Sequence, residues 1–307
     1  MYPTPYDNCE YVSTIEMDLS TYYNKSFIMH YPDFIFRGQG NCDWTVTPSF
    51  YRVDKKVWRE YIDSISMVTR CPNHINENSY PIKDYAERLI LKRFHDLSNL
   101  GGLYLPPDRP KWMTDSIENI VANWENNTYS HDGTKQIASL AQHHGCPTRL
   151  LDWTYNIDAA CYFATRPSED LKDYCVIWAI DIRLIRLIME MERDSNNGLM
   201  EIIIPLYYKN DNIIAQAGVF TLLPDGETDM IRYLNNVCRK YSDFVSGFRE
   251  RNGTNPMYQY IISKKNAEII YRQLIESGKD ANSFFPGYEG VTRSIEESLE
   301  YYRATRT

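Results

Sequence analysis

The chain lacks the features of secreted, membrane-spanning and disulfide-stabilised proteins. No window approaches the run of about 18 apolar residues that a transmembrane helix needs, so we expect no membrane span. The N-terminal stretch MYPTPYDNCEYVSTIEMDLS has no basic segment before an apolar run, which predicts that there is no signal peptide. The 7 cysteines are odd in number and form no CxxC pair, a pattern typical of reduced thiols. We therefore expect a cytoplasmic protein.

The sequence also lacks an excess of positive charge. Its formal net charge is -8, so the chain as a whole does not attract phosphate backbones, although a local basic groove would still permit nucleic-acid binding. Internal repeats and low-complexity stretches are absent as well. With 43% hydrophobic and 24% charged residues, the composition is that of an ordinary globular protein.

What is present is a mixture of short strands and amphipathic helices. Apolar, β-branched runs predict strands at residues 33–37, 148–154, 174–181, 200–204, 216–222 and 257–262. Periodicity and capping residues predict helices that start at Pro81 and at Asp132 or Thr134, and others at residues 156–165, 228–247, 264–277 and 289–303, with a short arm and a helix inside residues 1–30.

The connections between these elements are irregular and do not form βαβ units. This favours an α+β fold with a mixed, mainly antiparallel central sheet. The simplest division of the chain is a single domain, residues 1–307, with a mostly helical insertion at about residues 55–130.

The first candidate site follows the apolar run that begins at Phe34. Arg37 comes directly after this run and is followed by Gly38, Gln39 and Gly40. We interpret Arg37 as the end of a central strand, and the glycines as residues that let the chain turn without a side chain blocking the site.

The second candidate site is the stretch LAQHHGCPTRLLDWTYNIDAACYFA, residues 140–164. A strand period of two places Asp152 and Thr154 on one face, and Asn156 is a good cap for the helix that follows. A carboxylate and a hydroxyl beside a helix N-terminus suit phosphate, ribose and amide groups.

These two segments carry a family resemblance. The patterns FRGQG...W...PS..R and L.QHHG.PTRLLDWT.....A.YFA resemble the FRG domain, a family named for its Phe-Arg-Gly tripeptide. The segments AQAGVF, residues 215–220, and FFPGYEG, residues 284–290, resemble later blocks of the same family. The resemblance thus extends from about residue 10 to about residue 300.

The order of these blocks is similar to that of ADP-ribosyltransferases. The resemblance implies an ADP-ribosyltransferase-like sheet, NAD as the substrate, and transfer to a protein or nucleic acid by a toxin or a phage-defence effector. It also implies that Arg37 binds a diphosphate or the nicotinamide ribose, and that Asp152, Trp153 and Thr154 stand where those enzymes carry Ser-Thr-Ser.

The chain departs from that pattern at the catalytic glutamate. Gln216 stands at the comparable point, and an amide can hold a ribose hydroxyl but cannot act as a base. Either Asp152 or Glu289 supplies the carboxylate, or the chain is a non-catalytic nucleotide- or nucleic-acid-binding regulatory module.

The candidates divide into two groups. The catalytic candidates are Arg37, Asp152, Gln216 and Glu289. The candidates for nucleotide binding are Arg37, Gly38, Gln39, His143, His144, Arg149, Asp152, Trp153, Thr154 and Asn156.

Each candidate also has a structural interpretation. Arg37 can pair with Asp152 and tie two strands together. His143 and His144 can cap a helix C-terminus, and with Cys146 they lack the spacing of a zinc site, so we expect no metal. A nucleophilic triad of Cys146, His143 and Asp152 lacks evident oxyanion donors.

Overall fold

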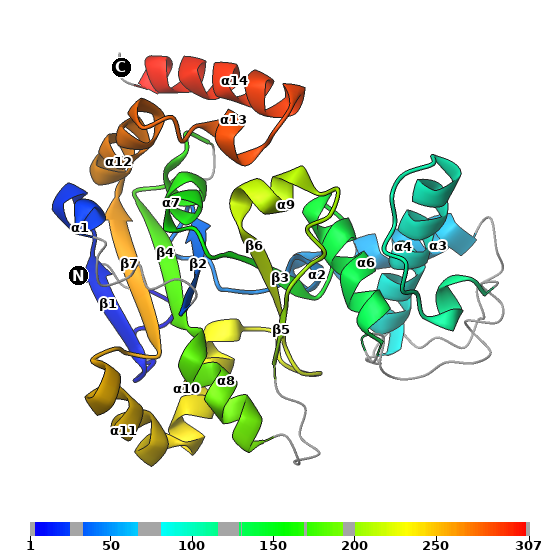
Figure 1. Cartoon of the computed structure of the whole chain (residues 1–307), viewed down its shortest axis with the longest axis horizontal. Coiled ribbons are helices and arrows are strands. Elements are labelled where there is room, and N and C mark those ends of the chain that lie inside the picture. Colours follow the sequence, from blue (N-terminus) through cyan, green and yellow to red (C-terminus); the bar gives the residue numbers. More distant parts are fainter. Residues whose placement is uncertain are drawn as a thin grey trace. The chain divides into compact units, whose positions relative to one another are not determined.

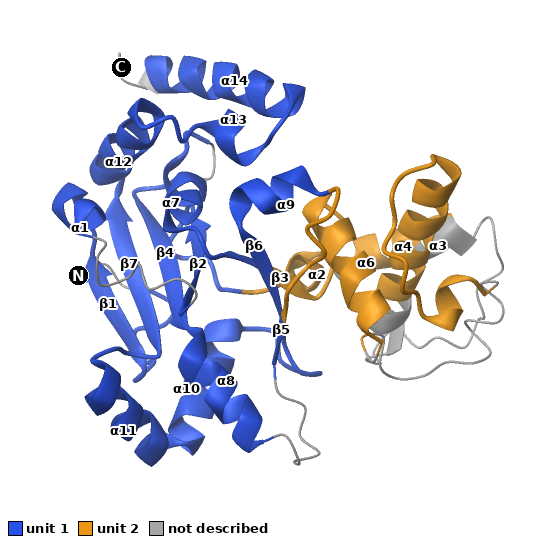
Figure 2. Ribbon diagram, viewed as in Figure 1, with its two compact units in different colours: residues 1–46, 152–202, 210–307 blue, residues 47–151, 203–209 orange. Residues whose placement is uncertain are grey.

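The chain forms two compact units. The computed structural model describes residues 4–24, 33–66, 81–115, 129, 131–168, 171–192 and 200–304. Unit 1 comprises residues 1–46, 152–202 and 210–307, and unit 2 comprises residues 47–151 and 203–209 (Figure 2). The expected insertion falls within the sequence range of unit 2, partly outside the described residues. A single domain over the whole chain stays a prediction.

The α+β class predicted from the sequence is confirmed. In the described part of the chain, the strands form one 7-stranded mixed sheet in the order β1-β7-β4-β2-β3-β6-β5 (Figure 1). The strands are β1 (Val12–Glu16), β2 (Phe34–Gln39), β3 (Leu150–Thr154), β4 (Tyr174–Asp181), β5 (Glu201–Ile203), β6 (Gly218–Leu222) and β7 (Met257–Ser263). β1 is parallel to β7, whereas β2 is antiparallel to β3 and β4, and β4 is antiparallel to β7.

The helices divide between the units. Unit 1 holds α1 (Leu19–Tyr23), α7 (Ile157–Thr165), α8 (Ile182–Met191), α9 (Asp211–Gln216), α10 (Met230–Lys240), α11 (Ser242–Asn252), α12 (Lys264–Glu276), α13 (Ala281–Phe284) and α14 (Tyr288–Ala304). Unit 2 holds α2 (Ser49–Arg52), α3 (Lys55–Ser66), α4 (Pro81–Leu100), the 3-10 helix η2 (Lys111–Met113) and α6 (Asp132–His143). No helix among the described residues has the length and apolar character needed to span a bilayer.

The central strand β2 packs against α7, and this contact explains Gly38. Phe34 and Phe36 belong to the same buried cluster as Ala160 of α7. A Cβ atom on Gly38 would lie 2.0 Å from the main-chain oxygen of Ala160 and 2.7 Å from the main-chain nitrogen of Ala164. Gly38 is therefore the residue that allows the helix to approach the sheet closely.

The predicted end of this strand was wrong. β2 does not stop at Arg37 but continues to Gln39, and Gly38 pairs with Ile177 inside the ladder. The sequence interpretation placed Gly38 in a turn because glycine is common in turns. In the structure, its lack of a side chain allows α7 to pack closely against β2.

Other elements also differ from the prediction. The strand expected from residue 216 begins at Gly218, because Asn210 caps the helix α9, which extends to Gln216. The single helix expected at residues 228–247 is two helices, α10 and α11, separated at Tyr241. The strand β1 and the helix α8 were not predicted.

Candidate functional site

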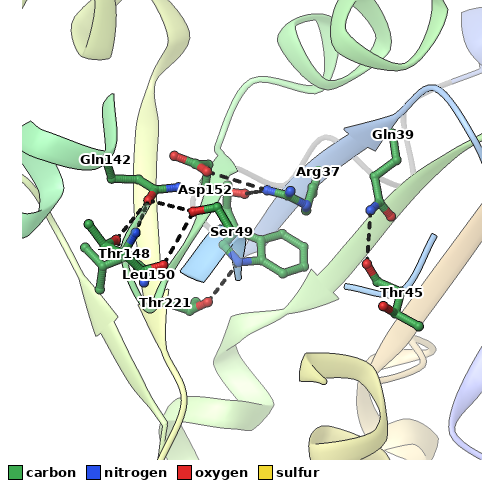
Figure 3. Close-up of polar contacts among 10 residues, drawn as sticks. Arg37, Gln39, Thr45, Ser49, Gln142, Thr148, Leu150, Asp152 and Thr221 are labelled. Atoms are coloured by element: carbon green, nitrogen blue, oxygen red, sulfur yellow. Dashed lines mark hydrogen bonds and ion pairs between the residues drawn. The ribbon is translucent and has the colours of Figure 1, made fainter. Parts of the chain in front are cut away.

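Arg37 lies in the middle of β2 and reaches across to β3. Its Nη1 donates a hydrogen bond to the main-chain oxygen of Asp152 at 2.8 Å, and lies 3.8 Å from Oδ2 of the same residue (Figure 3). The register between the two strands pairs Phe36 with Thr154. The guanidinium therefore adds a side-chain contact beside this pairing and helps to hold β3 against β2.

The two side chains of this pair differ in exposure. The Arg37 side chain is 15% exposed, whereas that of Asp152 is 50% exposed. The carboxylate is thus within reach of a solute, and the cation beside it is held in place by the protein. Sequence reasoning predicted that these two residues come together, and the structure places them in contact.

Thr154 is used by the protein itself. Its hydroxyl donates to the main-chain oxygen of Gln216 at 2.5 Å and accepts from the main-chain nitrogen of Asn156 at 2.8 Å. The residue is buried. Thr154 therefore joins β3 to the end of α9, which leaves little of its hydrogen-bonding capacity for a ribose.

Gln216 lies next to this junction, at the last turn of α9. Its Nε2 donates to the main-chain oxygen of Phe284 at 3.1 Å. The contact between Thr154 and Gln216 thus joins β3 to α9, two residues along β3 from Asp152. Sequence reasoning placed Gln216 on a strand, but the side chain comes from a helix end.

Asn156 caps α7 as predicted, because its Oδ1 accepts from the main-chain nitrogen of Asp158 at 3.0 Å. Asp158 itself stands in the first turn of α7, where it forms an ion pair with Lys279 and accepts from the hydroxyl of Tyr22. A protein carboxylate thus already lies at the positive end of this helix. A phosphate at this helix end would therefore lie beside the carboxylate of Asp158. The capping role of Asn156 alone did not predict this.

Trp153 and Gln39 are held by other side chains of unit 1. Trp153 is buried, and its Nε1 donates to the hydroxyl of Thr221 at 2.9 Å. Gln39 accepts from Nε1 of Trp178 at 3.0 Å. It donates to the main-chain oxygen of Thr45 at 3.4 Å (Figure 3). These contacts order the sheet, so neither residue presents an open stacking or hydrogen-bonding surface.

Arg149 is the centre of a buried cluster in unit 2. Its Nε lies 2.7 Å from Oε2 of Glu87, and its guanidinium stacks over the ring of Tyr129, 4.9 Å from the centroid. The hydroxyl of Tyr129 donates to the same carboxylate at 2.6 Å. Burial, and then the Glu87 charge, raise the pKa of Tyr129 well above its ordinary value. This is a structural ion pair, with the partner supplied from a helix that is distant in sequence.

The histidines of the central block stand at the end of α6. His143 is the last helical residue, and His144 is the C-cap, whose main-chain nitrogen bonds to the oxygens of the last turn. The neighbouring Gln142 accepts hydrogen bonds from Thr148, from both main-chain nitrogen and hydroxyl, and from the hydroxyl of Ser49 (Figure 3). These contacts fix the turn from α6 into β3.

Metal binding and thiol chemistry find no support at this turn. Among the residues that the structure describes, no group of three or more His, Cys, Asp and Glu is arranged to hold a metal ion. Burial raises the pKa of the Cys146 thiol, which is opposite to the shift that activates a nucleophile.

Glu289 lies apart from these groups, in the first turn of α14. Its side chain is 64% exposed and forms an ion pair with Arg293 at 2.7 Å. Within the described residues, no contact joins it to Arg37, Asp152 or Gln216.

The structure has pockets elsewhere. One of about 440 Å³ in unit 1 is lined by residues of α11 and the loop after it, including Arg249 and Thr254. Another of about 440 Å³ in unit 2 is lined mainly by residues of α4, both apolar and charged. Neither of these two pockets is lined by Arg37 or Asp152.

Comparison with known families gives a match. Residues 32–173 match the family model of the FRG domain. The match covers the segment around Arg37 and the central block, whereas the blocks at residues 215–220 and 284–290 lie outside it. Neither the curated proteins nor the solved structures gave a match.

Proposed function

Because the chain carries an FRG domain over residues 32–173, and because the family's central arginine stands beside a half-exposed carboxylate, we propose that unit 1 binds NAD or a closely related nucleotide at Arg37 and Asp152. The observation that carries this proposal is the contact between these two side chains. One group is a fixed cation and the other is an anion that solvent reaches.

The pair suits the two kinds of polar group in a dinucleotide. A guanidinium recognises phosphate oxygens, and a carboxylate accepts hydrogen bonds from ribose hydroxyls. The chain has a net charge of -8, so an anionic nucleotide needs a local cation to approach. Arg37 supplies this cation, and its hydrogen bond to the main chain of Asp152 orients it before the nucleotide arrives.

ADP-ribosyl transfer is the reaction that the resemblance implies for such a site. A nucleophile of the acceptor forms a bond to the anomeric carbon of the nicotinamide ribose, and the bond from that carbon to nicotinamide breaks. The nicotinamide leaves with the bonding electrons as a neutral molecule, and the proton of the acceptor passes to a carboxylate. We assign this role to Asp152, because Glu289 is paired with Arg293 on an exposed helix. The acceptor is a protein or a nucleic acid, as a toxin or phage-defence effector requires.

Calorimetry with NAD, and with ADP-ribose as a second ligand, tests the binding. We expect Asp152→Asn to weaken binding by about 10-fold to 100-fold, the value of a charged hydrogen bond. The matched control is Asp243→Asn, which removes the same charge from an exposed position in the first turn of α11. If neither ligand gives heat of binding at millimolar concentration, the proposal is wrong.

Transfer is tested separately, with labelled NAD and a cell extract. We expect label on a macromolecule with the unmodified chain and none with Asp152→Asn. If Glu289→Gln abolishes transfer and Asp152→Asn does not, the assignment of the base is wrong. If NAD binds but is neither transferred nor cleaved to release nicotinamide, the second function is favoured, a regulatory nucleotide-binding module. Gln216 at the place of the catalytic glutamate agrees with that function.

A further inference from the structure

Helix α14 is attached to unit 1 along one of its faces. Glu297 is buried there and accepts hydrogen bonds from the hydroxyls of Tyr162 and Tyr271. On the same face, a Cβ atom on Gly290 would lie 1.8 Å from the main-chain oxygen of Phe285, so the helix begins in close contact with the turn after α13. This face accounts for the attachment of α14 to the rest of unit 1 (Figure 1).

A second face of α14 is apolar and exposed. Its large side chains and their exposed fractions are Tyr288 (94%), Val291 (45%), Ile295 (67%), Leu299 (48%) and Tyr302 (51%). At about 100° per residue, the spacing of these positions places them on one stripe along the whole helix, on the side away from Glu297. A continuous stripe of this kind marks an interaction surface, unlike scattered single apolar residues.

The stripe is symmetric about its centre. Tyr288 and Tyr302 each lie seven residues from Ile295, and Val291 and Leu299 each lie four residues from it. If two such helices pair in antiparallel orientation with Ile295 against Ile295, each tyrosine meets a tyrosine and each valine meets a leucine. A surface that matches itself under a two-fold rotation is what an isologous dimer requires.

We propose that two copies of this chain associate through an antiparallel pair of α14 helices, with Ile295 at the two-fold axis. The charges beside the stripe favour this occupant and this orientation. Glu289 follows Tyr288 and Arg303 follows Tyr302, so the antiparallel pair places Glu289 of each copy beside Arg303 of the other. In a parallel pair, Glu289 of one copy and Arg303 of the other would lie 14 residues apart along the axis and would not meet.

The same charges disfavour a membrane surface as the occupant. Helices that bind membranes in the interfacial plane carry mostly Lys and Arg on their polar face. Here the residues beside the stripe include Glu289, Glu296 and Glu300. A second copy of the chain brings Arg303 as a counter-charge for Glu289, which an anionic lipid surface does not supply.

The mass in solution tests the association. Light scattering after size exclusion at tens of micromolar is expected to give twice the chain mass of 36.1 kDa. Ile295→Glu brings two carboxylates to the axis and is expected to weaken the dimer about 100-fold or more. The matched control is Leu187→Glu on α8, where an apolar side chain of 46% exposure receives the same charge without an effect on mass. A monomeric unmodified chain, or an Ile295→Glu chain that remains dimeric, overturns the proposal.

Cysteine cross-linking tests the orientation. Tyr288→Cys and Tyr302→Cys variants are oxidised separately and as a mixture, with the unmodified chain as the background for its own thiols. The antiparallel pair predicts a new disulfide between the two different variants, found only in the mixture, because identical positions are about 21 Å apart along the helix axis. Cross-linking of each variant with itself indicates a parallel pair and contradicts the proposal.

Discussion

At the scale of single residues, neighbouring positions of β2 serve opposite sides of the strand. Phe36 and Gly38 contact the α7 side, through the buried cluster and the close helix approach. Arg37, between them, reaches β3 and contacts Asp152. Two residues of the Phe-Arg-Gly tripeptide thus explain packing, and the arginine is the one on which the proposed nucleotide site depends.

Gly38→Ala is predicted to destabilise the protein by about 3 kcal/mol or more, because the new methyl group collides with the main chain of α7 and cannot be relieved by a side-chain rotation. The matched control is Gly247→Ala in α11, where the nearest atom to a new Cβ is the end of the Arg251 side chain at 3.8 Å. There we expect a gain of about 0.5–1 kcal/mol from helix propensity. Urea unfolding of both variants measures these changes, and equal effects would contradict the packing role of Gly38.

Some residue roles could be predicted from the sequence and others could not. The contact between Arg37 and Asp152 was predicted from polar residues embedded in two otherwise apolar strands, although both residues lie inside their strands and not at the ends. The partner of Arg149 could not be, since Glu87 lies 62 residues earlier in the chain and nothing local links them. The engagement of Thr154 by Gln216 was missed for the same reason.

At the scale of elements, the best predictions were helix starts marked by a local residue, either a proline or a capping side chain. The helix α4 begins at Pro81 and α7 is capped by Asn156, both as predicted. The edge strand β1 was missed because its register depends on β7, which is far away in the sequence. The helix α8 was missed although Asp181 caps it, since the cap residue is also the last residue of β4.

Ala217→Gly tests the end of α9. Ala217 has φ 47°, in the left-handed region where a Cβ atom costs about 1–2 kcal/mol and glycine does not. We expect a gain in stability of about 0.5–1 kcal/mol, measured by thermal or chemical unfolding. If residues 216–222 were one strand, as the sequence suggested, glycine in its interior would destabilise instead. Ala267→Gly, inside α12, is the control that should lose stability.

At the scale of the whole molecule, the sequence predicted the fold class more reliably than the function. The α+β class followed from short strands with irregular connections, and it is confirmed. The division into two compact units was not evident, because unit 2 has no linker composition at its boundaries and returns at residues 203–209. The cytoplasmic location and the binding of NAD remain predictions. Sequence patterns and the fold reveal how strands and helices pack, and neither property depends on that packing.

Buried thiols give the whole molecule a predictable response to alkali. Burial, followed by the charge of Asp43, raises the pKa of Cys42 from 9.0 to about 11, and burial alone raises that of Cys238 from 9.0 to about 12. An acid whose pKa is higher in the folded state binds its proton more tightly there. The contribution of such a thiol to the free energy of unfolding is complete below the pKa that it has in the unfolded chain. It is lost as the pH rises through the pKa that the thiol has in the folded protein. The free energy of unfolding should therefore fall from about pH 9 upward.

Removing one such thiol should make that fall less steep. We expect Cys238→Ala to reduce the loss by about 1.4 kcal/mol per pH unit between pH 9.0 and the folded pKa of about 12. The control is Val245→Ala in α11, which also truncates a fully buried side chain but removes no titrating group. It should lower stability at every pH and leave the pH dependence unchanged. Urea unfolding at intervals from pH 8 to pH 11 compares the three chains. An unchanged slope in Cys238→Ala would show that the thiol ionises as readily in the folded protein as in the unfolded one.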